Sequence, residues 1–104
     1  MRLKFFAVRV DGDISKRRKH VVLAVRYDEM KHELFIAGSV LFYEEMLSML
    51  NLLGLEHVVD KRINWRLKFI ATNVLPEMWD AGKALLERDG WMFEETSSFR
   101  RLSR

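Results

Sequence analysis

The chain reads Phe35-Ile36-Ala37-Gly38-Ser39-Val40-Leu41, and 34 positions further on it reads Phe69-Ile70-Ala71-Thr72-Asn73-Val74-Leu75. Five of these seven positions are identical. Each copy begins with strand-forming residues and leads into a longer segment of helical pattern. Ser39 and Asn73 occupy the same place in the two copies, and both residue types are favourable helix N-caps. The repeat therefore predicts two strand-to-helix junctions, capped by Ser39 and Asn73.

The sequence around the two copies predicts two units, residues 21–53 and 55–89, each a hairpin followed by a helix. One further strand is expected at each end, and Gly54 and Gly90 mark the helix ends. The order β-β-β-α-β-β-α-β predicts an α+β domain with a single, mainly antiparallel sheet and two helices on one face. The likeness of the two units is consistent with an internal duplication of a ββα unit. The expected strands are residues 3–10, 21–27, 33–38, 55–59, 63–71 and 91–95, and the expected helices are residues 40–53 and 74–89.

Length and composition are those of one soluble domain. A chain of 104 residues, 49% of them hydrophobic, can bury one core. Its apolar runs are too short to span a membrane, and the N-terminal residues 1–4 bring in charge too early for a signal peptide. We therefore expect a cytoplasmic protein that makes no membrane contact. It would have one domain over residues 1–95 and a basic, mobile C-terminal tail over residues 96–104.

Catalytic and metal-binding residue types do not form a recognisable motif in this sequence. The chain has no cysteine, and its three histidines, His20, His32 and His57, lack the spacing of metal ligands. Its five glycines do not form a phosphate-binding loop. Glu44 and Glu45 are adjacent on a predicted helix and point about 100° apart, so they do not converge on one substrate atom. We predict no catalytic residue, metal or cofactor, and an active site assembled from scattered positions is the alternative.

Positive charge is concentrated in a few segments of a chain whose net charge is +3. Eleven of the 18 Lys and Arg residues fall within residues 16–19, 61–68 and 100–104. Four consecutive cations between two predicted strands repel one another, and folding does not need them. They are interpreted as a contact to the phosphates of DNA or RNA, or else as a solvated loop that keeps the protein soluble. These cations are Lys16, Arg17, Arg18 and Lys19.

The predicted strand of residues 63–71 has the clearest alternation in the chain, which is typical of a half-buried strand with a basic outer face. The outward positions include Arg66 and Lys68, and Arg62 belongs to the expected turn of residues 60–62. These three cations would extend the basic loop into a longer track for nucleic acid. The positions expected to face the core are Ile63, Trp65, Leu67, Phe69 and Ala71.

The predicted first helix is apolar around most of its circumference, and such a helix is covered on more than one side. Its cover is either the protein's own core, or a second copy of the chain or another partner protein. With a second copy as the cover, the protein is a homo-oligomer. The interface residues would then be Tyr43, Met46, Met49 and Leu50.

Two functional hypotheses follow from these patterns. The leading one is a small, non-enzymatic protein that contacts nucleic-acid phosphates through its basic loop and basic strand face. The alternative is a homodimeric protein–protein adaptor or inhibitor that uses the apolar first helix. A small hydrolase or nuclease with dispersed carboxylates is a third class, and no group of residues supports it.

Overall fold

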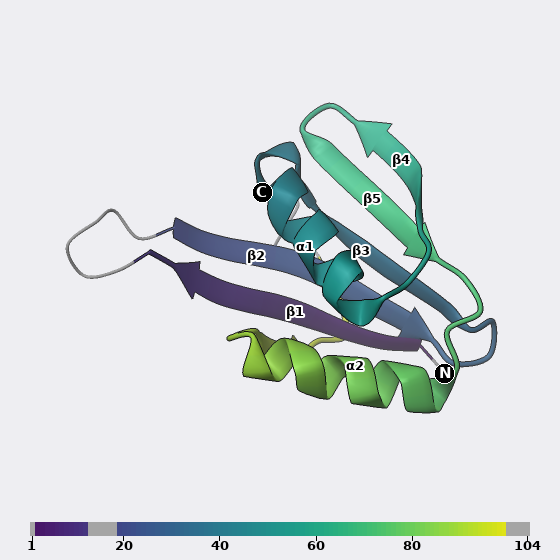
Figure 1. The fold of residues 1–104 in the computed structure, drawn as a ribbon. Helices are drawn as coiled ribbons and strands as arrows, with labels where there is room; N and C mark the ends of the chain where they lie inside the picture. Colours follow the sequence, from purple (N-terminus) through teal and green to yellow (C-terminus); the bar gives the residue numbers. More distant parts are fainter. Residues whose placement is uncertain (1, 13–18, 100–104) are drawn as a thin grey trace.

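The structure is a computed structural model that describes residues 2–12 and 19–99, and it has two layers, a six-stranded sheet and a pair of helices (Figure 1). The strands lie in the order β4-β5-β3-β2-β1-β6, and all neighbouring strands are antiparallel. The predicted α+β class, the single antiparallel sheet and the order of elements are confirmed. The elements are β1 (Arg2–Asp11), β2 (Lys19–Asp28), β3 (Glu33–Ser39), η1 (Val40–Phe42, a 3-10 turn), α1 (Tyr43–Leu53), β4 (Val58–Ile63), β5 (Arg66–Ala71), α2 (Pro76–Arg88) and β6 (Met92–Glu95).

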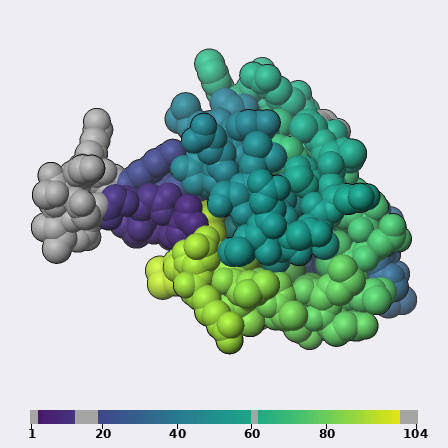
Figure 2. Space-filling view, viewed as in Figure 1, coloured from purple at the N-terminus to yellow at the C-terminus, as the bar shows by residue number. Residues whose placement is uncertain are grey.

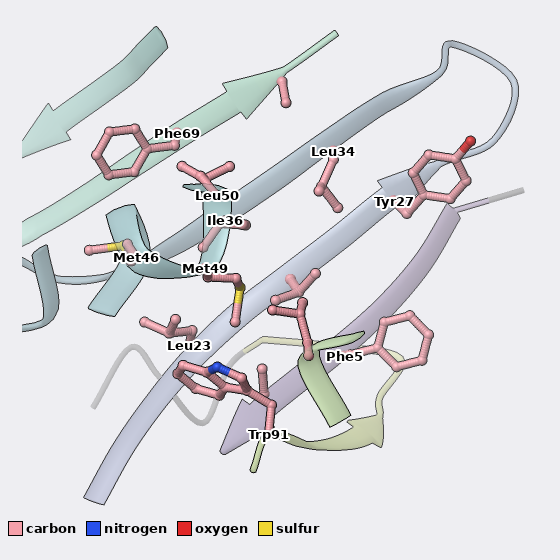
Figure 3. Packing of buried hydrophobic residues seen from close by; sticks show 14 of the residues in the cluster. Phe5, Leu23, Tyr27, Leu34, Ile36, Met46, Met49, Leu50, Phe69 and Trp91 are labelled. Carbon is pink, nitrogen blue, oxygen red and sulfur yellow. The ribbon is translucent and has the colours of Figure 1, made fainter. Parts of the chain in front are cut away.

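The core lies between the sheet and the two helices, which both cover the same face (Figures 1 and 3). Alternate residues of each strand point into this layer, because successive side chains of a strand point to opposite faces. In β2 the buried series is Val21, Leu23, Val25 and Tyr27. No helix of the described residues lies on the other face of the sheet. We call that face the open face.

Local signals explain how α1 begins and ends. The Ser39 Oγ accepts a hydrogen bond from the backbone N–H of Leu41 at 3.2 Å and so caps η1, which leads directly into α1. Gly54 ends α1 with a φ of 68°, a left-handed conformation that glycine adopts without steric cost. The predicted stop at Gly54 is confirmed, while Ser39 caps the 3-10 turn and the α-helix itself begins later than predicted, at Tyr43.

The apolar surface of α1 is covered inside the monomer, by the sheet on one side and by α2 on another. Met46, Met49 and Leu50 point into the core (Figure 3). Leu53 packs against α2 so closely that a Cβ at Gly82 would lie 2.5 Å from its Cδ2 atom. The predicted dimer interface is therefore corrected at Met46, Met49 and Leu50, because these side chains belong to the chain's own core. Tyr43 alone of the four predicted interface residues is exposed.

The β4–β5 hairpin turns at Asn64 and Trp65. The sequence placed this turn at residues 60–62, so the predicted turn starts four residues too early. Ile63 pairs with Arg66, so two residues make the connection, and Asn64 has a φ of 53°. Asparagine tolerates this left-handed conformation better than most residues. The alternation of residues 63–71 runs through a turn this short without a break, which is why it resembled one long strand. Two residues expected in the core are exposed instead: Trp65 stands at the tip of the hairpin, and Ile63 pairs with Arg66 on the open face.

The second helix starts later than predicted. It begins at Pro76, and Leu75 before it is extended with a ψ of 155°, as the residue before a proline prefers. Asn73 has a φ of 60° and lies outside the helix, while the N–H of Val74 donates to the carbonyl of His32 at 2.9 Å. The prediction that Asn73 caps this helix was wrong, because Pro76 fixes the first turn.

The two copies of the repeated stretch pair with each other. Phe35 faces Ile70 and Ile36 faces Phe69, in the antiparallel pairing of β3 with β5. The β2–β3 hairpin extends the sheet on one side of this pairing and the β4–β5 hairpin extends it on the other. Phe69 is buried under the helices whereas Phe35 lies on the open face, so the two copies do not occupy equivalent positions. The starts of the two helices differ, so the duplication of a ββα unit stays a hypothesis.

A buried hydrogen bond ties the segment before α2 to the sheet, and it yields a stability prediction. The Tyr27 hydroxyl donates to the carbonyl of Val74 at 2.6 Å, while its ring stacks on Trp79 with centroids 5.8 Å apart. Changing Tyr27 to Phe leaves that carbonyl unpaired in the core. We expect the free energy of unfolding to fall by about 1–3 kcal/mol, measured by urea denaturation at pH 7.

The same tyrosine also predicts how stability depends on pH. Burial, followed by nearby carboxylates led by Glu29, raises the pKa of Tyr27 above its usual value. The unfolded chain loses the phenolic proton first, so the stabilisation is present below the unfolded pKa and is lost as pH rises through the folded pKa. Urea denaturation at high pH should show a smaller alkaline loss for Tyr27→Phe than for the wild type. An equal loss in both would contradict this assignment.

Candidate nucleic-acid interface on the open face of the sheet

The open face is lined by the strand residues whose neighbours in sequence are buried under the helices. On β5, for example, Leu67, Phe69 and Ala71 are buried, and the residues between them point the other way. Paired residues of antiparallel strands share a face, so the strand register extends this assignment across the sheet. The residues of the open face include Lys4, Phe6, Arg26, Phe35, Ala37, Ile63, Arg66, Lys68 and Ile70.

The centre of the open face holds an aromatic ring between two cations. Phe35 on β3 pairs with Arg26 on β2, and Lys68 on β5 stands one diagonal step away, opposite Ala37. The guanidinium carbon of Arg26 lies 4.2 Å from the centroid of the Phe35 ring, and the Lys68 Nζ lies 4.4 Å from it. Each contact is a cation–π interaction, which orders a long side chain that would otherwise move freely. Two cations from β2 and β5 are therefore held at one place by the aromatic ring of the strand between them.

A hollow adjoins this cluster at the β4–β5 end of the sheet. It has a volume of about 400 Å³, and Trp65 at the hairpin tip is 77% exposed beside it. Its lining is mostly apolar, with Arg66 and Lys68 supplying the charge. The described residues that line it include no carboxylate. Ala37 and Ile63 contribute apolar surface to the lining, together with Trp65.

The far part of the open face is covered by the end of the described chain. The ring of Phe99 packs edge-on against Phe6 with centroids 5.6 Å apart, and the Lys4 Nζ lies 5.9 Å from the Phe99 centroid. The N–H of Thr96 donates to the carbonyl of Lys4 at 2.9 Å, so the segment after β6 continues along β1. Of the expected C-terminal tail, residues 100–104 lie outside the described residues, and its mobility stays a prediction.

Negative charge on the open face lies at the β6 edge and at the end of the β2–β3 hairpin, where it adjoins the Phe35 cluster. Glu94 pairs with Phe6 at the β6 edge, and Glu33 pairs with Asp28 at the end of the β2–β3 hairpin. The carboxylate of Asp28 is engaged in the turn, where it accepts hydrogen bonds from the N–H groups of Met30 and Lys31 at 3.0 and 3.1 Å. Glu33 stands two residues before Phe35 on β3, so the positively charged part of the face is the part that holds Arg26, Lys68 and Arg66.

The structure separates the cations that the sequence had grouped together. Arg66 and Lys68 share the open face, as predicted. Arg62 was predicted in a turn but lies on β4. It pairs with Leu67, so its side chain points to the helix side of the sheet. Lys19 begins β2 on the helix side, where its Nζ forms an ion pair with Glu45 at 2.8 Å. Lys16, Arg17 and Arg18 lie outside the described residues.

Lys19 stands on a two-stranded arm, and another cation anchors the base of that arm. The outer neighbours of these two strands end early: β6 pairs with only part of β1, and β3 pairs with only part of β2. Past that point β1 and β2 pair only with each other, as a ribbon that reaches past the helices (Figures 1 and 2). The guanidinium of Arg9 contacts Asp11 and Asp89, each at 2.7 Å, and lies 4.6 Å from the Trp91 ring. The hydrogen bond to Asp11 raises the pKa of Arg9 above its usual value. Arg9 therefore fixes the arm to the end of α2 and serves the fold.

Arg26 and Phe35 are site residues that the sequence reasoning missed. A usable signal was present, because each stands at a position whose neighbours on both sides are apolar and strand-forming. Hairpin register would have placed the two opposite each other. A cation facing an aromatic residue on the solvent side of a hairpin is the pattern to search for.

No described group of three or more His, Cys, Asp or Glu side chains comes close enough to hold a metal ion. In residues 2–12 and 19–99, neither helix has the length and apolar character needed to cross a membrane. Comparison of the chain with known protein families, with characterised proteins and with solved structures found no match. The open face is therefore the basis for inferring a function.

Proposed function

We propose that this is a cytoplasmic, non-enzymatic protein that binds nucleic acid through the open face of its sheet and the basic segment of residues 16–18. The observation that carries the proposal is the Phe35 ring held between Arg26 and Lys68, with Arg66 on the same face. Folding gains little from cations kept on an exposed face, since exposed charges contribute weakly to stability. A polyanion gains much from them, because each neutralised phosphate releases counterions.

The arm supports the same proposal. Residues 13–18 lie between β1 and β2 in the sequence, and they include three of the cations predicted to contact phosphates. A β-ribbon is one of the elements that proteins use to enter a groove of nucleic acid. Lys19 contributes less to the proposal than these three cations, because its ammonium group is paired with Glu45.

The proposal is tested by removing the charge of the open face. In one variant Arg26, Arg66 and Lys68 become Gln, which keeps much of each side-chain stem. We expect the slope of log affinity against log salt for a single-stranded oligonucleotide to fall in magnitude by about 2, at roughly 0.7 per phosphate contact. The measurement is fluorescence anisotropy with a labelled oligonucleotide at several salt concentrations.

A control variant with the same change in net charge keeps the test specific. It changes Lys31, Arg62 and Arg88 to Gln, three exposed cations that lie off the open face. We expect this control to reduce the slope by much less than the open-face variant. Equal effects of both variants, or no binding by the wild type at low salt, would contradict the proposal.

A second candidate function is self-association through the edge strand β4, as part of an adaptor. Val58, Val59 and Ile63 on this strand are more than half exposed. An edge strand with exposed apolar side chains can pair with another strand, and a lysine there opposes such pairing. If the protein is a dimer, Val58→Lys should yield folded monomers, whereas Leu41→Lys on η1 should not. Light scattering after size exclusion distinguishes them, and a wild type that is monomeric at high concentration removes this candidate.

A further inference from the structure

We infer that the hollow beside Trp65 is a stacking site for one base of a single-stranded nucleic acid, with Arg66 and Lys68 holding its phosphates. This inference rests on the proposed function and adds the class of ligand and the residue that receives the base. The shared chemistry of that ligand is a planar aromatic ring linked to a phosphate. The ligand that we infer is one nucleotide within a single-stranded nucleic acid.

Trp65 is exposed in a way that the other two tryptophans are not. Its exposed fraction is 77%, whereas Trp79 and Trp91 are each 2% exposed and belong to the core. Its backbone is nonetheless fixed, because its carbonyl accepts a hydrogen bond from the N–H of Val40 at 2.7 Å and the flanking strands pair directly after the turn. An indole on a fixed turn is available to a ligand at little cost in backbone order.

The hollow has the chemistry of a nucleotide site. Ala37, Ile63 and the indole of Trp65 supply apolar surface for a base, while Arg66 and Lys68 supply positive charge at the rim. Its volume of about 400 Å³ lies within the range of about 300–1,000 Å³ typical of small-molecule sites. Charge complementarity therefore favours an anionic, planar ligand over an uncharged or cationic one.

Lys68 connects this hollow to the centre of the open face. It lines the hollow, and its Nζ also lies 4.4 Å from the Phe35 ring. A strand whose base stacks on Trp65 can therefore continue along β5 and β3 with its backbone over Lys68 and Arg26. Because Arg26 and Lys68 already contact the Phe35 ring, Trp65 is the aromatic side chain left to receive a base on this part of the face.

A single strand fits this arrangement better than a duplex does. Bases inside a duplex stack on one another and expose only their edges, whereas bases of a single strand offer their faces to aromatic side chains. Stacking on a tryptophan tolerates all four bases, because every base has a π face. The expected ligand is therefore a single strand of little sequence preference.

The test compares Trp65→Ala with Trp65→Phe and with Leu41→Ala, which removes an equally exposed apolar side chain outside the hollow. We expect Trp65→Ala to weaken binding of a short oligouridine or oligothymidine by about 10- to 100-fold. Trp65→Phe should retain most of the affinity, and Leu41→Ala should retain all of it. Binding of a duplex of equal length should change by less than threefold in Trp65→Ala, because phosphate contacts remain.

Tryptophan fluorescence gives a second readout. A base stacked on Trp65 should quench the emission of the wild type, and Trp65→Phe, which keeps the two buried tryptophans, should show no such quenching.

Oligonucleotide binding that is unaffected by Trp65→Ala would overturn this inference while leaving the proposed function standing. Absence of binding to any nucleic acid at low salt would overturn both. A mononucleotide that competes as well as the oligonucleotide would also overturn the assignment of a single-stranded ligand. The same holds for a wild-type dimer that Trp65→Ala converts to monomers.

Discussion

Met49→Glu is expected to abolish folding of this protein. Met49 is 1% exposed and packs in the centre of the core, between α1 and the sheet (Figure 3). A carboxylate there loses its water without gaining a partner, and the cost of several kcal/mol is comparable to the whole stability of a small domain, about 5–15 kcal/mol. Circular dichroism and size exclusion should show an unfolded or aggregated chain.

Tyr43→Glu is the matched control, because it places the same charge on the same helix. Tyr43 is 46% exposed, so its replacement should keep the protein folded and lower the free energy of unfolding by about 1 kcal/mol or less. A folded Met49→Glu protein that has lost a dimer contact would contradict the core placement. It would also restore the interface expected from the sequence.

Changing Lys16, Arg17 and Arg18 together to Ser should have the largest effect on binding. If each contacts one phosphate of a single strand, the slope of log affinity against log salt falls in magnitude by about 2. Raising the salt from 50 to 200 mM weakens binding of both proteins, and the weakening should be about 20-fold smaller for the variant than for the wild type. This ratio follows from roughly 0.7 per contact. Fluorescence anisotropy over this salt range measures the slope.

Two comparisons make this second prediction specific. Lys19→Ser alone should change the slope little, because that ammonium group is held by Glu45 in the folded protein. Thermal unfolding of the triple variant should match the wild type within about 0.5 kcal/mol, since surface charges away from packed features rarely stabilise a fold. An unchanged salt slope would show that residues 16–18 only solubilise the chain. The open face would then be the sole proposed contact.

The layer architecture was predictable because its signals are local and strong. Apolar runs bounded by turn residues define the strands, and Ser39 and Gly54 mark the start and end of the first helical segment through their own backbone preferences. The order of elements then leaves few ways to cover a single sheet. These features need no knowledge of long-range contacts.

Errors arose where two local signals competed. At residues 63–71 the alternation of apolar residues outweighed the turn preference of Asn64, so the hairpin tip was misplaced and Trp65 was assigned to the core. At the second helix the cap preference of Asn73 was given more weight than the restriction that Pro76 imposes on Leu75. In both places the backbone geometry of one residue decided the outcome.

The candidate site was only half predictable, because it is assembled from strands distant in sequence. Arg66 and Lys68 were found through alternation on one strand. Arg26 and Phe35 join them only through the register of β2 with β3 and of β3 with β5, which the sequence does not specify directly. Lys19 was over-weighted because its partner, Glu45, lies 26 residues further along the chain.

The central claim, that nucleic acid binds the open face, is tested most directly by the methyl signals of the chain's four isoleucines. Ile63 lines the hollow, Ile70 lies on the open face, Ile36 is fully buried under the helices, and Ile14 belongs to the segment between β1 and β2. On titration with a single-stranded oligonucleotide, methyl NMR should show shifts for Ile63 and Ile70, with Ile36 unchanged. Shifts confined to Ile36, or no shift at Ile63 and Ile70 at saturating oligonucleotide, would contradict the claim.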